Sequence, residues 1–98
     1  MRKISEIKNI ESMKTWAKLF KPCKALAGNK ELLNSIKEQD FEKVCDIIAE
    51  NDDICENLIR IFAIIDDVPY NDYELSFIEV PGRMIELLND DRFMAFFR

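Results

Sequence analysis

The apolar segment at residues 53–67, DICENLIRIFAIIDD, restricts the possible folds of this chain more than any other. Its large apolar residues recur at i, i+4, i+7, i+8 and i+11, which is the spacing of one face of an α-helix. The residues on this face are Ile54, Leu58, Ile61, Phe62 and Ile65. Ile59 and Ile64 widen the face, and a helix that is apolar around so much of its circumference is usually central. We therefore predict a central helix that ends near Val68 and Pro69.

The rest of the chain also favours helices with short connections. It has 98 residues but only two glycines and three prolines, so residues that interrupt regular structure are rare. Residues that commonly cap helices precede three further apolar segments: Asn29, Asp40, and either Asn89 or Asp90. The expected core positions after the first two caps are Leu32, Leu33, Ile36, Phe41, Val44, Cys45, Ile47 and Ile48. We predict an all-α fold, a small helical bundle of about four to six helices that forms a single domain over residues 1–98.

The first helix is expected to begin near Ser12, which we interpret as its cap. The apolar side of this helix is expected to hold Met13, Trp16, Ala17 and Phe20. The lysines on the opposite side, which we expect to face water, are Lys14, Lys18 and Lys21. Pro22 is expected to end or kink the helix, and the Gly28-Asn29 pair is a stop signal.

Residues 70–84, YNDYELSFIEVPGRM, combine the signals of two structures. Apolar and polar residues alternate from Tyr73 onward, as in a strand, whereas SFIE fits a helix capping box. Pro81 fits best at the first position of a new helix. We expect a short extended segment near 73–79 and then a helix from Pro81 to about Leu88. The residues expected to be exposed on it are Arg83 and Glu86, and those expected to be buried are Met84, Ile85 and Leu88.

The side chains needed for common catalytic and metal sites are missing or poorly spaced. The sequence has no histidine, which excludes Ser-His-Asp and Cys-His arrangements and removes the commonest metal ligand. The adjacent aspartate pairs, at 52–53, 66–67 and 90–91, cannot share a helix face, so we interpret them as caps and solvated charge. The three cysteines lack zinc-site spacing, and we interpret them as small buried hydrophobes: Cys23, Cys45 and Cys55. We predict no enzymatic activity, no cofactor and no metal.

Charge is distributed unevenly along the chain. Residues 1–30 carry eight Lys/Arg and two Asp/Glu, whereas residues 31–98 carry six and seventeen. The two parts therefore have net charges of +6 and −11, and the whole chain has −5. Nucleic acid is not an expected partner, because the overall charge repels phosphate. No apolar run approaches the roughly 20 residues of a membrane span, and residues 1–12 lack the apolar block of a secretory signal, so we expect a cytoplasmic protein.

Large apolar side chains are concentrated in the segment RFMAFF at residues 92–97. On a helix, Phe93, Phe96 and Phe97 share one face at i, i+3 and i+4. Such residues either pack onto the core of their own chain or contact another molecule, and the sequence leaves both options open. The candidate partner-binding residues are Phe93, Met94, Phe96 and Phe97.

From about residue 36 to residue 97, the order of features resembles the small tail assembly chaperones of long-tailed bacteriophages and prophages. The features are the apolar helix LIRIFAII, the aromatic and acidic turn DDVPYNDYELS, the helix MIELLND and the final RFMAFF. The chain departs from this pattern at Pro81 and Gly82, which interrupt what is otherwise more continuous helix. Its basic first 30 residues have no counterpart in the pattern.

The resemblance implies a non-enzymatic role in the cytoplasm of a bacterial host. Such chaperones coat the long, apolar, helical tape measure protein before the tail tube forms around it. A tape measure protein is therefore the expected partner, and a homo-oligomer is the expected assembly. Aromatic and methionine side chains suit this role, because they adapt to many apolar helical stripes.

The acidic character of residues 31–98 favours a different class of function. A small acidic phage-encoded inhibitor, or an antitoxin-like binding module, could occupy the nucleic-acid site of a host protein. A nucleic-acid regulator that uses the lysine-rich first helix is a third reading, and it requires retention on DNA that depends steeply on salt.

Overall fold

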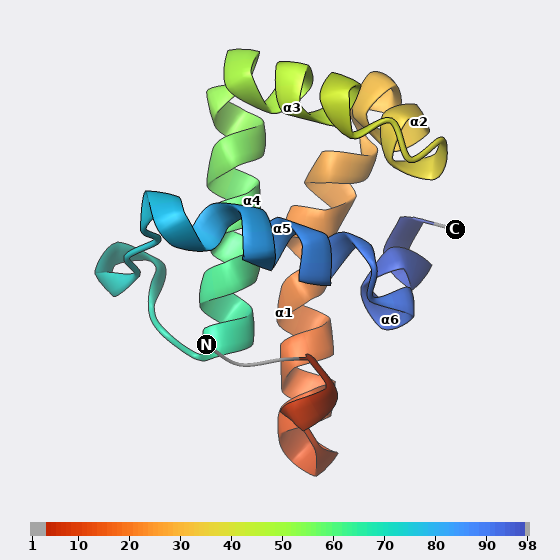
Figure 1. The fold of residues 1–98 in the computed structure, drawn as a ribbon. Coiled ribbons are helices and arrows are strands. Elements are labelled where there is room, and N and C mark those ends of the chain that lie inside the picture. The colour runs from red at the N-terminus through yellow and green to blue at the C-terminus, as the bar shows by residue number, and fades with distance from the viewer. Residues whose placement is uncertain (1–3, 98) are drawn as a thin grey trace.

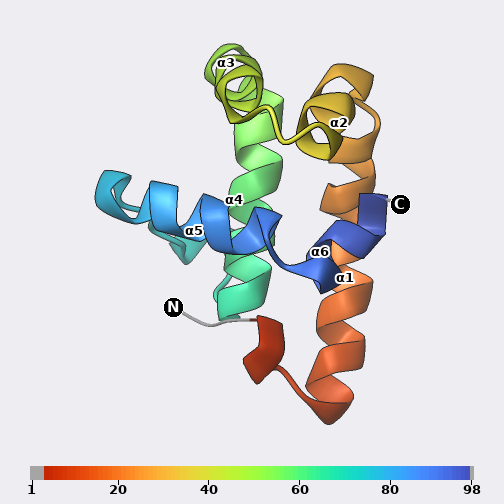
Figure 2. The same cartoon turned by 45° about the vertical axis from the view of Figure 1, so that its right-hand side comes forward.

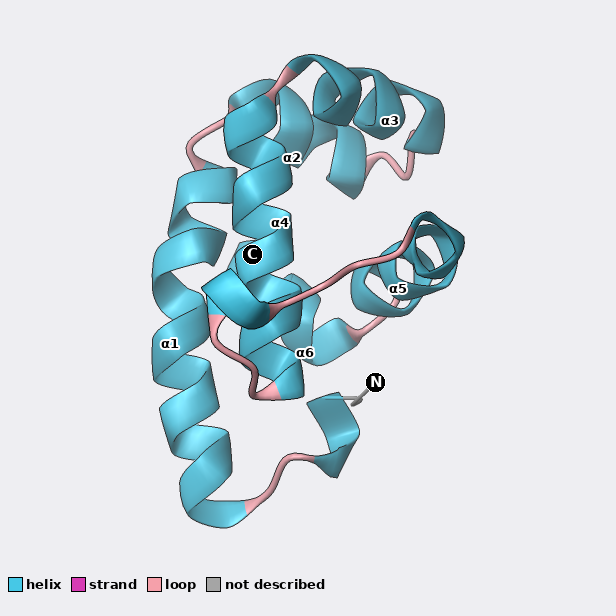
Figure 3. Cartoon of the chain, turned by 90° about the vertical axis from the view of Figure 1, so that its left-hand side faces the viewer, coloured by secondary structure: helices cyan, strands magenta, loops and turns pink. Residues whose placement is uncertain are grey.

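A computed structural model describes residues 4–97, and within this range every regular element is helical (Figures 1 and 3). The α-helices are α1 (Asn9–Ala27), α2 (Lys30–Lys37), α3 (Phe41–Glu50), α4 (Asp52–Asp66), α5 (Val80–Leu88) and α6 (Asp91–Met94). Short 3-10 turns form η1 (Ile4–Glu6), η2 (Tyr70–Asp72), η3 (Phe77–Glu79) and η4 (Ala95–Phe97). The predicted all-α fold of about four to six helices is confirmed.

The two longest helices, α1 and α4, lie side by side and run in opposite directions (Figures 1 and 2). At one end of this pair, α2 and α3 connect the two helices. Helix α5 crosses the pair, and α6 with η4 then returns the chain to α1. Buried side chains from all of these helices form one hydrophobic cluster.

Helix α4 occupies the central position that its apolar pattern predicts. All five residues of the predicted face are buried: Ile54, Leu58, Ile61, Phe62 and Ile65. The helix ends where Asp67 takes a left-handed conformation with φ of 57°, immediately before Val68 and Pro69. Asp tolerates this conformation better than most residues do, so the end of the helix is encoded locally.

The buried face of α1 differs from the predicted one. The residues that α1 buries are Thr15, Leu19, Pro22, Cys23 and Leu26, which repeat the i, i+4, i+7, i+8, i+11 spacing of α4. The predicted apolar side is wrong, because Met13, Trp16 and Phe20 are exposed. The distance between two packed helix axes depends on the side chains at their contact, and this face has no aromatic residue or methionine. The large apolar residues Met13, Trp16 and Phe20 lie outside this buried face.

The ends of α1 also differ from expectation. The helix begins at Asn9, three residues before the predicted cap, and the Ser12 hydroxyl donates to the Ile7 carbonyl oxygen at 2.9 Å instead of capping the helix. Pro22 does not end the helix, which continues to Ala27. Pro22 lies in the buried face of α1, and its missing N–H removes one backbone hydrogen bond of the helix.

Side-chain caps fix the starts of three later helices, as predicted. The side chain of Asn29 accepts from the Leu32 amide at 3.0 Å, and that of Asp40 from the Lys43 amide at 3.2 Å. Of the two alternatives for the last helix, Asp90 is the cap. In α3, Val44 and Ile47 are buried as expected, but the core positions predicted for Phe41 and Cys45 are wrong because both are exposed. Cys23 is buried and Cys55 half-buried, so the interpretation as buried hydrophobes fails for Cys45 alone.

The segment between α4 and α5 is extended over a shorter range than predicted. Tyr73 and Ser76 have extended backbone angles, but the chain turns into η3 at Phe77. Helix α5 begins at Val80, one residue before the predicted start at Pro81.

Replacement of a central isoleucine tests the core. Ile61 is fully buried, and we expect Ile61→Ala to lower the free energy of unfolding by about 2–4 kcal/mol, because it leaves a cavity between α4 and its neighbours. Ile85 is exposed, so Ile85→Ala is the matched control and is expected to change stability by less than about 0.5 kcal/mol. Urea unfolding followed by circular dichroism measures both. Similar losses in the two variants would contradict the assigned rotation of α5.

The pH dependence of stability tests the burial of Cys23. Burial raises the pKa of this thiol from 9.0 to about 12. A raised pKa means that its contribution to stability is complete below the unfolded value and is lost as the pH rises toward the folded one. We expect the free energy of unfolding to decline between about pH 9 and about pH 12, and to decline less steeply in Cys23→Ala. Urea unfolding across this range measures the slope, and Cys45→Ala controls for the loss of a thiol as such.

Candidate protein-binding surface

An apolar groove of about 520 Å³ lies between α1, η1 and α6. Its walls come from Ile4, Met13, Thr15, Trp16, Phe93 and Phe96, among others. Arg92 is the only charged residue among the described residues that line it. The groove therefore offers a large apolar surface with one cation at its edge.

A series of aromatic rings connects this groove to the core. The ring centroids of Trp16 and Phe20 are 6.2 Å apart, and those of Trp16 and Phe96 are 6.4 Å apart in a stacked arrangement. The ring centroids of Phe96 and Phe93 are 6.3 Å apart. Rings at these separations attract one another in addition to the area that they bury. Trp16 and Phe96 are consequently held in place, although each keeps part of its surface in water.

The four partner-binding residues predicted from the sequence separate into two pairs. Phe93 and Phe97 are buried in the core, with ring centroids 5.3 Å apart, whereas Met94 and Phe96 are half-buried. Phe93 and Phe97 thus pack onto the core of their own chain. In this conformation only Met94 and Phe96 have surface to offer to another molecule, and partner binding by the four residues stays a prediction.

Sequence reasoning missed the residues of α1 that form the rest of the apolar surface. They recur at i, i+3, i+6 and i+10 along one side of the helix: Ile10, Met13, Trp16 and Phe20. The spacing of Met13, Trp16 and Phe20 predicts the buried face of the helix, whereas the structure exposes these residues. The signal that could have separated the two options is the second stripe at Thr15, Leu19 and Cys23, whose spacing matches that of α4.

A second exposed apolar feature lies at the start of α5. Phe77 and Ile78, in the turn η3, are 92% and 88% exposed and are the most exposed large apolar side chains of the described residues. Acidic residues surround this pair in the sequence, because residues 61–82 contain five Asp/Glu and no Lys or Arg. We call Phe77 and Ile78 the apolar turn.

A buried ionic network fixes the start of α5 against the end of α4. The guanidinium of Arg83 forms an ion pair with Asp66, in which Nη2 donates to Oδ1 at 3.2 Å, and its Nη1 donates to the Tyr73 hydroxyl at 2.7 Å. That hydroxyl donates to Asp66 Oδ2 at 2.7 Å. The guanidinium also lies 4.8 Å from the ring centroid of Phe62. Each of the three side chains therefore has a hydrogen-bond partner within the network, as buried polar groups require.

The predicted exposure of Arg83 is wrong, because its side chain is only 4% exposed. With Arg83 turned inward, Leu87 one turn later is also buried. Ile85 was expected to be buried but is exposed, and Met84 and Leu88 are half-buried. Helix α5 is thus rotated from the orientation that hydrophobicity alone predicts, because the ion pair decides which side faces α4.

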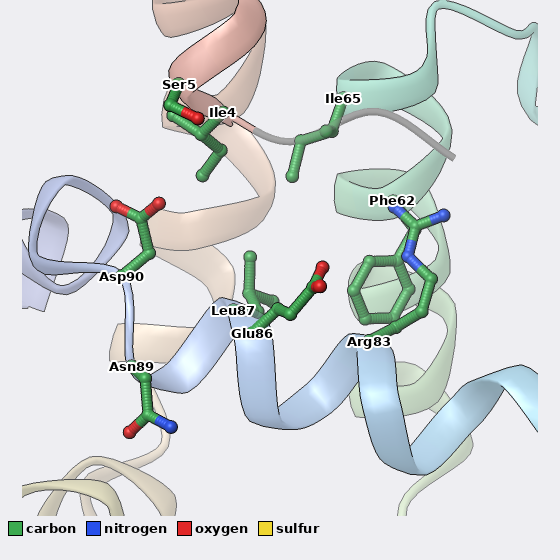
Figure 4. A pocket seen from close by; sticks show the side chains of 9 residues that line it. All are labelled: Ile4, Ser5, Phe62, Ile65, Arg83, Glu86, Leu87, Asn89 and Asp90. Carbon is green, nitrogen blue, oxygen red and sulfur yellow. The ribbon is translucent and has the colours of Figure 1, made fainter.

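The network also changes the chemistry of Tyr73. Burial, and then the hydrogen bond to Asp66, raise the pKa of its phenol well above the usual range, and the charge of Arg83 opposes this only partly. The tyrosine therefore stays protonated and remains a hydrogen-bond donor. A cavity of about 220 Å³ beside Arg83 and Glu86 (Figure 4) has a cation that is already engaged by Asp66, so an anionic ligand has little to gain there.

The described residues contain no cluster of three or more His, Cys, Asp or Glu side chains that could hold a metal ion. Among residues 4–97, no helix has the length and apolar character needed to cross a membrane. Comparison of the chain with protein-family models, with curated proteins and with solved structures finds no match. Inferences about function therefore depend on the groove, the apolar turn and the distribution of charge.

Replacement of Arg83 tests the network. We expect Arg83→Ala to lower the free energy of unfolding by about 3–5 kcal/mol, because it leaves the Asp66 carboxylate partly buried without its cation. Adding Asp66→Ala to this variant should cost less than Asp66→Ala costs alone. Arg60, which lies over the ring of Tyr70 at 4.4 Å on the surface, is the matched control, and Arg60→Ala is expected to cost far less. Additive losses for Arg83 and Asp66 in urea unfolding would contradict the pairing.

Proposed function

We propose that this chain is a non-enzymatic assembly chaperone that binds an apolar helical segment of a protein partner. The observation that carries the proposal is the apolar groove between α1 and α6, together with the exposed large residues of α1. The proposed partner is a tape measure protein of a long-tailed phage, in line with the resemblance of residues 36–97 to tail assembly chaperones. Its place of action would be the cytoplasm of a bacterial host.

The chemistry of the groove suits a helical partner. An amphipathic helix presents side chains at i, i+3, i+4 and i+7, and it buries them in a long apolar groove of another protein. Met13 lines the groove, and the flexible thioether of methionine adapts to side chains of different shapes. Large contiguous apolar surfaces are uncommon on proteins that act alone, which also supports a binding role.

The acidic composition supports the same proposal. A chaperone loaded with an apolar segment must stay in solution, and net charge far from zero opposes association of the loaded complexes. The chain has a net charge of −5, and residues 31–98 alone have −11.

A second candidate function is inhibition of a host nucleic-acid-binding protein by acidic mimicry. The observation that favours it is the concentration of five acidic residues, without Lys or Arg, in residues 61–82. This function would use the surface around η2 and η3 rather than the groove, so the two candidates predict different sensitive residues.

Fluorescence of Trp16 tests the groove directly, because it is the only tryptophan in the chain and it lines the groove. The probe is a tryptophan-free synthetic helix with leucines at i, i+3, i+4 and i+7. We expect its binding to shift the emission of Trp16 to shorter wavelength, because the indole loses contact with water. We expect Met13→Glu combined with Phe20→Glu to weaken binding by at least about tenfold, because Met13 lines the groove and the ring of Phe20 lies 6.2 Å from that of Trp16.

Phe41→Glu is the matched control, because Phe41 is 49% exposed outside the groove and Phe20 is 52% exposed beside Trp16. An equal loss of binding in Phe41→Glu and in the Met13→Glu, Phe20→Glu variant, or an unchanged emission of Trp16 with the synthetic helix, would contradict the groove as the binding site.

The partner is tested by co-expression with a phage tape measure protein. We expect the tape measure protein to stay soluble with the wild-type chain and to aggregate with the variant that carries Met13→Glu and Phe20→Glu.

A further inference from the structure

We infer that the apolar turn of one copy docks in the α1–α6 groove of a second copy, so that copies associate head to tail. This inference rests on the proposed function, because it gives the proposed partner site a competing occupant. The groove would be filled by another copy until a partner helix displaces it.

The apolar turn has the properties of a docking element. Phe77 and Ile78 are almost completely exposed, and burial in a partner would remove more apolar surface from water than burial of other exposed residues would. The turn is also held in position, since Arg83, Tyr73 and Asp66 join the segments on both sides of it. A fixed element loses little conformational freedom when it binds.

The charges around the two surfaces are complementary. Arg92 is the only charged residue among the described lining of the groove, and it is exposed. The apolar turn is flanked by Glu74 and Glu79, both exposed. A contact that brings Arg92 of one copy to these glutamates of another aligns the two copies.

The positions of the two surfaces require a second copy. Figures 1 and 2 both place the start of α5 beyond α4, on the side of the molecule away from α1, whereas α6 lies against α1. The apolar turn therefore cannot reach the groove of its own chain. Contact between two different surfaces is heterologous, and it continues from copy to copy unless the rotation closes a ring.

A symmetric pairing of two α1 helices is disfavoured by the same charges. Exposed lysines recur along α1 at Lys14, Lys18, Lys21 and Lys24. Packing α1 on its own copy would bring these like charges together, and like-charge contacts reduce affinity. The exposed glutamates beside the apolar turn, Glu74 and Glu79, have the opposite charge.

Complementation between two variants provides the test. The turn variant combines Phe77→Asp with Ile78→Asp, and the groove variant combines Met13→Glu with Phe20→Glu. All four side chains are more than half exposed, so both variants are expected to fold, which circular dichroism checks. We expect each variant alone to sediment as a monomer, and an equimolar mixture to form a one-to-one dimer, because one intact turn and one intact groove remain. The wild-type chain is expected to form larger species as its concentration rises.

Two further arms separate this inference from the proposed function. Glu74→Lys combined with Glu79→Lys should weaken wild-type association by at least about tenfold if the charges align the copies. The synthetic helix should dissociate the wild-type assembly and should still bind the turn variant. A monomeric wild-type chain, self-association of the turn variant, or a mixture without dimers would overturn the inference. If the synthetic helix still shifts the emission of Trp16 in these cases, the proposed function stands without it.

Discussion

The buried pairing of Arg83 with Asp66 determines the arrangement of the second half of the molecule. Moving a guanidinium and a carboxylate out of water costs several kcal/mol for each ion, so the pair is stable only with good geometry and further hydrogen bonds. The Tyr73 hydroxyl and the ring of Phe62 supply these contacts. Because the two charges lie on α4 and α5, the pair fixes the rotation of α5, and through it the exposure of Ile85 and the position of the apolar turn.

A second constraint acts at the contact between α1 and α4. This contact uses Thr15, Cys23 and other small or compact side chains of α1, which allow the two helices to approach. Trp16 lies outside the buried face of α1, where it stacks on Phe96 and forms one wall of the groove. The groove is therefore a consequence of how the core is packed.

The sequence predicted those features that depend on neighbouring residues. The face of α4 and the caps Asn29, Asp40 and Asp90 follow from local spacing and hydrogen bonding, and the structure has them. The face of α1 was mispredicted because two stripes compete on one helix and hydrophobicity favours the larger residues, whereas packing favours the smaller ones. Burial of Arg83 was mispredicted because its partner lies 17 residues earlier. Periodicity placed Phe93, Phe96 and Phe97 on one face, but it carries no information about which of them the core has room for.

The separation of charge along the sequence becomes a separation in space. Four exposed lysines lie on α1, and the acidic turn around η3 lies beyond α4 on the other side. Each of these sides also has exposed apolar residues, so neither charge nor hydrophobic area is balanced within one copy. Burial of such apolar residues in a partner of complementary charge removes their surface from water. Contact between these two different surfaces gives any assembly of the copies a direction.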